Sequence, residues 1–227
     1  MNDEPAIAGV AGRTAAILTL FALVFTALMA ATYRATLPVI QASTEEEKMK
    51  LVDEVLPRGL YDNLLLADYL TIGPLAQLGL DEPVRLFRAR KNDRPAALVF
   101  EMAATEGYGG RIRLIVAAGA DGRLVGVRVV SHKETPGLGD YIDPRKDRNK
   151  AQPWIRQFDN SGFEQVPPAR WKVKKDGGLF DSRAGATISA RAVTHATRRA
   201  LQFAAENRDK LYALPAKSAF DAPTEKP

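Results

Sequence analysis

The sequence predicts an α+β fold: an antiparallel sheet flanked by helices and preceded by one N-terminal transmembrane helix. Three observations predict it. An uncharged stretch of 20 residues lies near the N-terminus. Apolar runs with strand-like patterns then alternate with turn signals between residues 84 and 132. A helical repeat of apolar residues follows near the C-terminus, and this order of elements is typical of helices packed on an antiparallel sheet.

The first element is the stretch from Thr14 to Tyr33, which Arg13 and Arg34 bracket and which follows a short tail over residues 1–13. A helix rises about 1.5 Å per residue, so this stretch can cross a hydrocarbon core of about 30 Å. A cleaved signal peptide is the alternative, but its apolar region usually spans about 7–15 residues behind a basic segment. The leader here carries two acidic residues and one arginine, which favours a retained anchor.

The charges beside this stretch leave its orientation open. Arg34, Lys48 and Lys50 follow it, against Arg13 before it, and this count leans weakly toward a cytoplasmic C-terminal domain. An acidic run over residues 45–47 weakens the count, and large domains are translocated largely regardless of charge.

A helical connecting region is predicted over residues 34–80. Ser43 or Thr44 can cap a helix, with a glutamate three residues later as a capping box, and Pro57 to Gly59 end it. Glycine and proline interrupt the apolar stretch from Tyr61 to Leu80, so we interpret it as mixed helix and loop.

At least four strands are predicted next, at residues 84–88, 96–102, 111–116 and 124–130. Asp121-Gly122 is a hairpin turn signal between the last two. Trp154–Phe158 is interpreted as a helical turn and Trp171–Val173 as one more strand. The last helix runs from about Ser189 to Arg208, because apolar residues recur there at helical spacing. Residues 213–227 contain three prolines and are expected to be mobile.

Composition excludes several classes of function. The chain has no cysteine and two histidines, so it offers no disulfide framework, no thiolate metal site and no iron–sulfur cluster, and we predict no metal. Its net charge is +5, from 32 basic and 27 acidic residues, without a dense basic block, which argues against nucleic acid. No G-x-G-x-x-G motif follows a strand, which argues against a Rossmann-type site. Redox chemistry would therefore need a borrowed organic cofactor of another kind.

Two segments can carry chemistry. The first runs from Asp181 to Ser189 and directly precedes the last helix. Its small residues allow close approach to the backbone, and free amides at a helix start favour an anion such as a phosphate. The alternative is an ordinary N-terminal cap, with Thr187 or Ser189 as the capping oxygen. The second segment, His132 to Asp140, follows a strand and is either a functional loop or an ordinary tight turn.

The two segments together resemble one family. HKETPGLGD, followed some forty residues later by D-x-x-x-G-A-T-x-S at a helix start, is similar to the FMN-binding G subunit of the Rnf electron-transport complex. The related C subunit of the sodium-translocating NADH:quinone oxidoreductase shares the domain. The resemblance covers most of the chain and implies an FMN-binding domain over residues 81–212, in a chain anchored by the helix over 14–33.

The resemblance implies FMN joined through its phosphate to the hydroxyl of Thr187. Asp181 matches the aspartate of the family signature D-x-x-[ST]-G-A-[ST], and Gly185 and Ala186 match its small pair. Position 184 departs from the signature, since alanine stands there in place of serine or threonine. Amides from Gly185 to Ser189 would stabilise the phosphate charge.

In the second segment, Thr135, Gly137 and Leu138 are the candidates for the isoalloxazine site. Trp154 or Trp171 could stack on the ring, although such aromatics are more often core. Lys133 or Arg183 could stabilise an anionic flavin, although such cations are more often solvated.

The resemblance further implies an electron-carrying subunit of a membrane-bound, redox-driven, ion-translocating complex. A flavin transferase would attach the FMN, and the other subunits of the complex would be the partners. The domain would lie on the periplasmic side of the inner membrane. Three alternatives stay open: the FMN-binding relative in the sodium-translocating quinone oxidoreductase, a flavin-free anchored extracytoplasmic binding or scaffold module, and a soluble flavin enzyme that binds FMN without a covalent bond.

Overall fold

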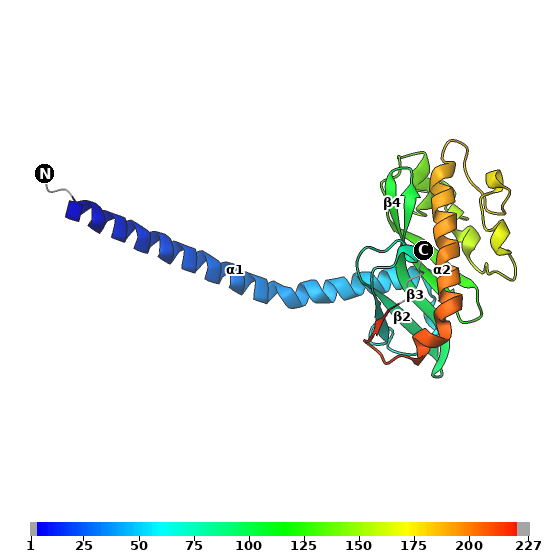
Figure 1. The fold of residues 1–227 in the computed structure, drawn as a ribbon, viewed down its shortest axis with the longest axis horizontal. Coiled ribbons are helices and arrows are strands. Elements are labelled where there is room, and N and C mark those ends of the chain that lie inside the picture. Colours follow the sequence, from blue (N-terminus) through cyan, green and yellow to red (C-terminus); the bar gives the residue numbers. More distant parts are fainter. Residues whose placement is uncertain (1–3, 222–227) are drawn as a thin grey trace. The chain divides into compact units, whose positions relative to one another are not determined.

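The computed structural model describes residues 4–221, with side chains for residues 11–34, 36 and 49–221 (Figure 1). The chain divides into two compact units, Met1–Met49 and Lys50–Pro227. Helix α1 (Glu4–Val55) begins in the first unit and ends in the second.

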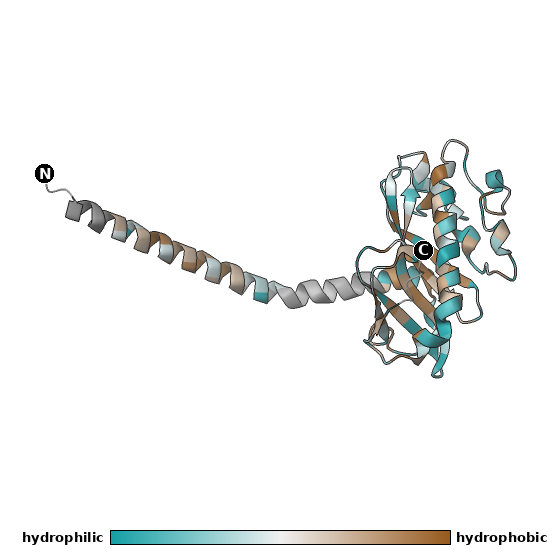
Figure 2. Ribbon diagram, in the orientation of Figure 1, coloured by the Kyte–Doolittle hydropathy of each residue, from teal (hydrophilic) through white to brown (hydrophobic). Residues whose placement is uncertain are grey.

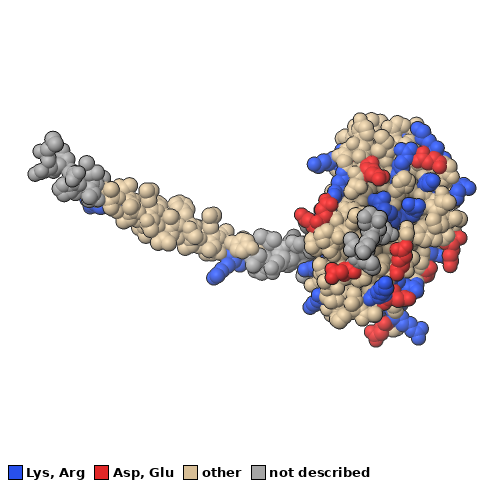
Figure 3. Space-filling model, in the orientation of Figure 1, with Lys and Arg blue, Asp and Glu red and all other residues tan. Residues whose placement is uncertain are grey.

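The segment Ala11–Arg34 of α1 is long and apolar enough to cross a membrane, as the sequence predicts. Hydrophobic residues dominate it in Figure 2. In Figure 3 the same stretch carries no charged side chain between Arg13 and Arg34. A helix that is apolar all round is typical of a membrane span.

The predicted separate helix starting at Ser43 or Thr44 is wrong, because α1 is continuous through both residues. A capping side chain satisfies amides that have no preceding helical carbonyl, and here the preceding turns supply those carbonyls. The predicted end of the helix is confirmed, since α1 stops at Val55, just before Pro57.

The sheet has six strands in the order β5-β4-β3-β2-β1-β6. Neighbours from β1 to β5 are antiparallel, and β1 and β6 are parallel. The strands are β1 (Tyr69–Ile72), β2 (Val84–Lys91), β3 (Arg94–Gly107), β4 (Gly110–Gly119), β5 (Leu124–Ser131) and β6 (Ala219–Phe220).

The four predicted strands are confirmed as β2 to β5, and so is the turn at Asp121-Gly122, where Gly122 has a φ of 79°. Strand β1 was not predicted within residues 61–80, which otherwise contain a short 3₁₀ turn, Ala76–Leu78. Ala219–Phe220 form β6 within the tail expected to be mobile. The strand predicted at Trp171–Val173 is wrong: Val173 makes only an isolated bridge to Phe180.

Alternate residues of the strands face two hydrophobic clusters. In β3, Leu98 and Phe100 belong to the cluster that α2 (Thr187–Ala213) covers, whereas Ala97 and Val99 face Val52 and Leu56 from the end of α1 and the residues after it. Figure 1 shows α2 packed along the sheet, and it contacts β3 and β4. Successive side chains of a strand point to opposite faces of the sheet, so a sheet covered on both sides buries both sets of residues.

Between β5 and α2 the chain makes loops and short 3₁₀ turns, at Gly139–Ile142, Trp154–Phe158, Pro168–Arg170 and Lys174–Asp176. The helical turn predicted at Trp154–Phe158 is thereby confirmed. Aromatic side chains pack against one another along this segment, and the ring centroids of successive pairs lie 4.7–5.5 Å apart. In order of contact, these residues are Tyr141, Trp154, Phe158, Phe180, Trp171 and Phe163. Aromatic packing replaces regular secondary structure here.

Candidate functional site

Thr187 is the first residue of α2, and its side chain is half-buried. The N-cap is Ala186, and no side chain caps the helix. The alternative of Thr187 or Ser189 as the capping oxygen is therefore wrong. The Thr187 hydroxyl has one weak contact, at 3.5 Å from the carbonyl oxygen of Arg183. This hydroxyl lies at the positive end of a 27-residue helix and is not consumed by capping.

The residues before Thr187 form a turn that needs glycine. The Ala186 amide donates to the Arg183 carbonyl at 3.1 Å, and Gly185 has a φ of 82°. A Cβ at Gly185 would have no atom outside its neighbours within 4 Å, so the turn faces open space. Glycine is used here for its backbone conformation, and a ligand can approach the turn.

Tyr141 holds this turn from the protein side. Its side chain is buried, and its hydroxyl accepts from the Arg183 amide at 3.1 Å and donates to the Ala186 carbonyl at 3.2 Å. The Arg183 guanidinium lies 4.4 Å from the centre of the Tyr141 ring. Burial raises the pKa of Tyr141, so its hydroxyl stays protonated and able to donate. One side chain thus fixes both ends of the turn.

Asp147 fixes the guanidinium of Arg183. Its fully buried carboxylate pairs with Arg183 and accepts from the amides of Trp154 (2.7 Å) and Asn149 (3.0 Å). Burial alone would raise the pKa of Asp147, but these hydrogen bonds and the charge of Arg183 outweigh it and hold the pKa below its ordinary value. Arg183 is therefore engaged within the protein and is not simply a solvated cation.

Asp181 is held through its backbone. Its amide donates to Gln157 Oε1 at 2.6 Å, and its carbonyl accepts from Trp154 Nε1 at 2.7 Å. Its exposed carboxylate pairs with Lys174 at 2.6 Å. The structure thus places the Asp181 side chain on the surface, at the start of the loop that leads to α2.

The loop after β5 reaches the start of α2 through Glu134. The Ser189 hydroxyl donates to Glu134 Oε2, and the Gly109 amide donates to Oε1 at 2.9 Å. A Cβ at Gly139 would lie 2.6 Å from Ser189 Oγ, so loop and helix are in close contact. The structure therefore brings the two predicted segments together, and adds the β3–β4 hairpin to them.

The tip of this loop is a tight turn. The amides of Leu138 and Gly139 both donate to the Thr135 carbonyl at 3.1 Å, and Gly137 has a φ of 75°. The Gly137 amide donates to Asp140 Oδ1 at 2.9 Å. Leu138 is left 53% exposed. An exposed apolar side chain on a tight turn is available to contact a ligand or a partner.

Exposed apolar side chains gather on the segments that meet here. Tyr108, at the β3–β4 hairpin tip, is 71% exposed, and Leu138 and Ile188 are also exposed. Trp154 and Trp171 are 8% and 0% exposed and pack on other rings, so neither has a free face for stacking. The ring-stacking interpretation of these two residues is therefore wrong, and their core interpretation is correct.

Sequence reasoning missed Tyr108, Glu134, Tyr141 and Asp147. Glu134 lies within the quoted motif, but its burial depends on Ser189, 55 residues away in the chain. Asp147 stands in a charged run that resembles a solvated surface. Nothing in the sequence signals which of these polar residues are buried, since their partners are distant in the chain.

The sequence comparisons agree with this geometry. The FMN-binding domain matches residues 107–202, which span the hairpin tip, the loop and most of α2. The class of protein is therefore one with an FMN-binding domain. The RnfG N-terminal region matches residues 9–55, which include the apolar segment.

Relatives named as the G subunit of the ion-translocating oxidoreductase complex align over most of the chain. The protein from Pseudoalteromonas atlantica is 40% identical over 86% of this chain and 89% of its own length. That from Pseudomonas aeruginosa is 42% identical over 88% and 92%, and that from Shewanella loihica is 39% identical over 90% and 94%. The chain belongs to this G-subunit family of the ion-translocating oxidoreductase complex.

Proposed function

We propose that this chain is the electron-carrying subunit of an Rnf-type ion-translocating membrane complex and holds FMN as a phosphoester on Thr187. The observation that carries the proposal is the uncapped start of α2 in an FMN-binding domain, with the Thr187 hydroxyl beside free amides. Bound FMN would supply one- and two-electron transfer.

The residues at the start of α2 fit a phosphate group. Amides of the first turn, without a capping side chain, are hydrogen-bond donors for phosphate oxygens, and the helix dipole favours their charge. The positive φ of Gly185 opens the backbone next to Thr187. Leu138 and Ile188 supply apolar surface for the isoalloxazine ring, with Thr135 and Gly137 shaping the loop.

Attachment would use FAD as the donor and a flavin transferase as the catalyst. The Thr187 oxygen would form the ester bond to the FMN-side phosphorus of FAD as the P–O bond to the AMP phosphate breaks, and the hydroxyl proton would leave with AMP. Asp181, whose carboxylate is exposed at the edge of the loop, is available to the transferase. Tyr141 and Arg183 hold the turn while Thr187 is modified.

A tethered flavin suits a carrier because it cannot diffuse away between partners. The apolar segment Ala11–Arg34 would hold the carrier in the inner membrane, beside the other subunits of the complex. We place the FMN-binding domain on the periplasmic side, following the family resemblance in preference to the weak charge count. Without its partners, the chain would have little activity of its own.

The test is in-gel flavin fluorescence of the denatured full chain, made in cells with a flavin transferase. A fluorescent wild-type band, lost in Thr187→Ala and kept in Thr187→Ser, is expected. Ser182→Ala is the matched control, since it removes a hydroxyl from the same loop and should keep the band. A wild-type band without flavin fluorescence, in cells where a known flavoprotein is labelled, would refute the proposal.

Orientation can be tested separately because the chain has no cysteine. Ala169 is exposed, so Ala169→Cys offers a single reactive thiol to a membrane-impermeant maleimide. Labelling in intact spheroplasts is expected for Ala169→Cys, and Asn2→Cys should label only after lysis. The reverse pattern would place the domain in the cytoplasm.

A further inference from the structure

Glu134 is a buried carboxylate without a cation. Its side chain belongs to a residue only 4% exposed, and both oxygens accept from neutral donors, Ser189 Oγ and the Gly109 amide. No ion pair of Glu134 occurs among the side chains that the structure describes. A buried charge without a counter-ion is costly, so this one calls for a physical reason.

The carboxylate lies at the cofactor end of α2. Ser189, its hydrogen-bond donor, is two residues after Thr187. A Cβ at Gly139 would lie 2.7 Å from Glu134 Oε2, which places the loop tip against the same oxygen. The Gly109 bond brings the base of the Tyr108 hairpin to the other oxygen. All three segments that would surround a flavin on Thr187 therefore meet at Glu134.

Basic side chains of the surrounding segments have other partners. His132 accepts from the Glu134 amide through Nδ1 at 3.1 Å, and its Nε2 lies 3.8 Å from Asp143 Oδ2. Arg183 pairs with Asp147, and Lys174 pairs with Asp181. Lys133 is exposed to solvent, where its charge is screened. The positive end of the α2 dipole and two neutral donors hold the negative charge of Glu134 in place without cancelling it.

We propose that Glu134 sets the reduction potential of the flavin on Thr187, an inference that rests on the proposed function. Each electron added to the ring raises its negative charge or draws in a proton. A fixed negative charge nearby, shielded from water, disfavours the added electron and so lowers the potential. Glu134 is thus a residue that makes the reduced carrier a stronger donor to the next carrier.

The test is a spectroelectrochemical titration of the flavin in the full chain, purified in detergent after coexpression with a flavin transferase. Glu134→Gln keeps the shape: its amide oxygen can accept from Gly109, and its amide nitrogen can donate to Ser189 Oγ. The midpoint potential is expected to move to more positive values. A midpoint equal to that of the wild type, or lower, would overturn the inference.

Glu101→Gln is the matched control. Glu101 pairs with Arg113 and lies in β3 on the same side as Val99, which faces away from α2. The control removes one negative charge from the chain but should leave the midpoint unchanged. A positive shift of the same size in Glu101→Gln would show that overall charge, and not Glu134, sets the potential.

Ser189→Ala provides a second test with the opposite sign, for the case that Glu134→Gln fails to load flavin. It removes a donor from the carboxylate. Titrated at alkaline pH, where the carboxyl group stays ionised, the midpoint should move to more negative values. An unchanged or more positive midpoint in Ser189→Ala would contradict the inference. A dark denatured wild-type band would instead refute the proposed function, which separates the two failures.

Discussion

The two ends of α2 are built in opposite ways. At the N-terminal end no side chain caps the helix, Gly185 opens the backbone and Thr187 keeps its hydroxyl nearly free. At the C-terminal end, Arg88 donates to the carbonyls of Leu211 (2.9 Å) and Leu214 (2.6 Å). One end is left open to a ligand, and the other end is closed by the protein.

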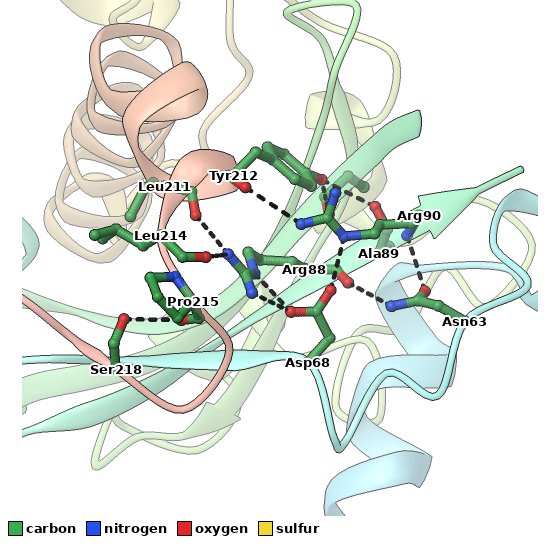
Figure 4. A network of polar contacts seen from close by, with 11 residues as sticks. Asn63, Asp68, Arg88, Ala89, Arg90, Leu211, Tyr212, Leu214, Pro215 and Ser218 are labelled. Atoms are coloured by element: carbon green, nitrogen blue, oxygen red, sulfur yellow. Dashed lines mark hydrogen bonds and ion pairs between the residues drawn. The ribbon is translucent and has the colours of Figure 1, made fainter. Parts of the chain in front are cut away.

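Figure 4 shows how the closed end is held. Asp68 accepts from both Arg88 and Arg90, and Arg90 also donates to the Tyr212 carbonyl at 3.3 Å. The Tyr212 hydroxyl lies within hydrogen-bond distance of the carbonyls of Ala89 (2.9 Å) and Ala97 (2.8 Å), which share its single proton. Two guanidinium groups neutralise the negative end of the helix dipole. Because these contacts anchor the C-terminal end of α2, the helix can keep its position without a capping side chain at its N-terminal end.

The largest expected effect comes from breaking the closed end. Arg88 is 2% exposed, so Arg88→Ala removes one of the two guanidinium partners of Asp68 and takes a donor away from the carbonyls of Leu211 and Leu214. We expect a loss of about 3–5 kcal/mol in the free energy of unfolding, typical of a broken buried pair. Urea unfolding of the full chain in detergent measures it. Arg113→Ala, which removes an exposed pair, should cost less than about 1 kcal/mol, and equal losses would contradict the contrast.

The next effect is at the open end and depends on pH. Asp147→Asn weakens the tie to Arg183, and a hydrogen bond to a charged group contributes about 1.5–3 kcal/mol. The pKa of Asp147 in the folded chain lies below its ordinary value of 3.8. Its contribution is therefore complete above that value and is lost as the pH falls through the lower folded pKa. The free energy of unfolding of the wild type, measured by urea unfolding, should therefore fall below about pH 4. An equal fall in Asp147→Asn would contradict this role of Asp147.

Two tyrosines test the same contrast. Each contacts two backbone groups through its hydroxyl, Tyr141 at the turn before Thr187 and Tyr212 at the far end of α2. Tyr141→Phe and Tyr212→Phe should each cost about 1 kcal/mol, the usual contribution of a hydrogen bond. In-gel fluorescence per mole of protein should fall only in Tyr141→Phe. An equal fall in both would show that loading follows stability alone.

The contribution of Tyr212 to stability can also be tested at alkaline pH. Burial raises the pKa of Tyr212 to about 12. Because the folded pKa exceeds the ordinary value of 10.0, the stabilisation is complete below pH 10 and is lost as the pH rises toward 12. The Tyr212→Phe variant should show a smaller loss of stability across that range, and an unchanged slope would contradict the assignment.

The elements that the sequence predicted correctly are those whose own residues carry a regular apolar pattern or a turn signal. The strands β2 to β5 follow from apolar runs and a turn signal. Strand β1 is four residues long and β6 two, too short to leave a pattern, and each pairs with a distant partner. Glu134 and Asp147 are buried only because Ser189 and Arg183 come to them in the fold. Such pairings are tertiary, so the residue types alone did not reveal them.

The smallest expected effect concerns two glycines with nearly the same backbone. Gly185 has a φ of 82° and Gly177 a φ of 80°, and a Cβ at either position would meet no atom within 4 Å. Alanine at either site should therefore cost only the strain of a left-handed residue, about 1 kcal/mol. Loading should differ: Gly185→Ala places a methyl group on the face where phosphate would approach Thr187, whereas Gly177 lies in another turn. In-gel fluorescence that falls in Gly185→Ala alone would separate access to the hydroxyl from backbone strain, because the strain is matched. A matched fall in Gly177→Ala would show instead that strain in either turn is enough to prevent loading.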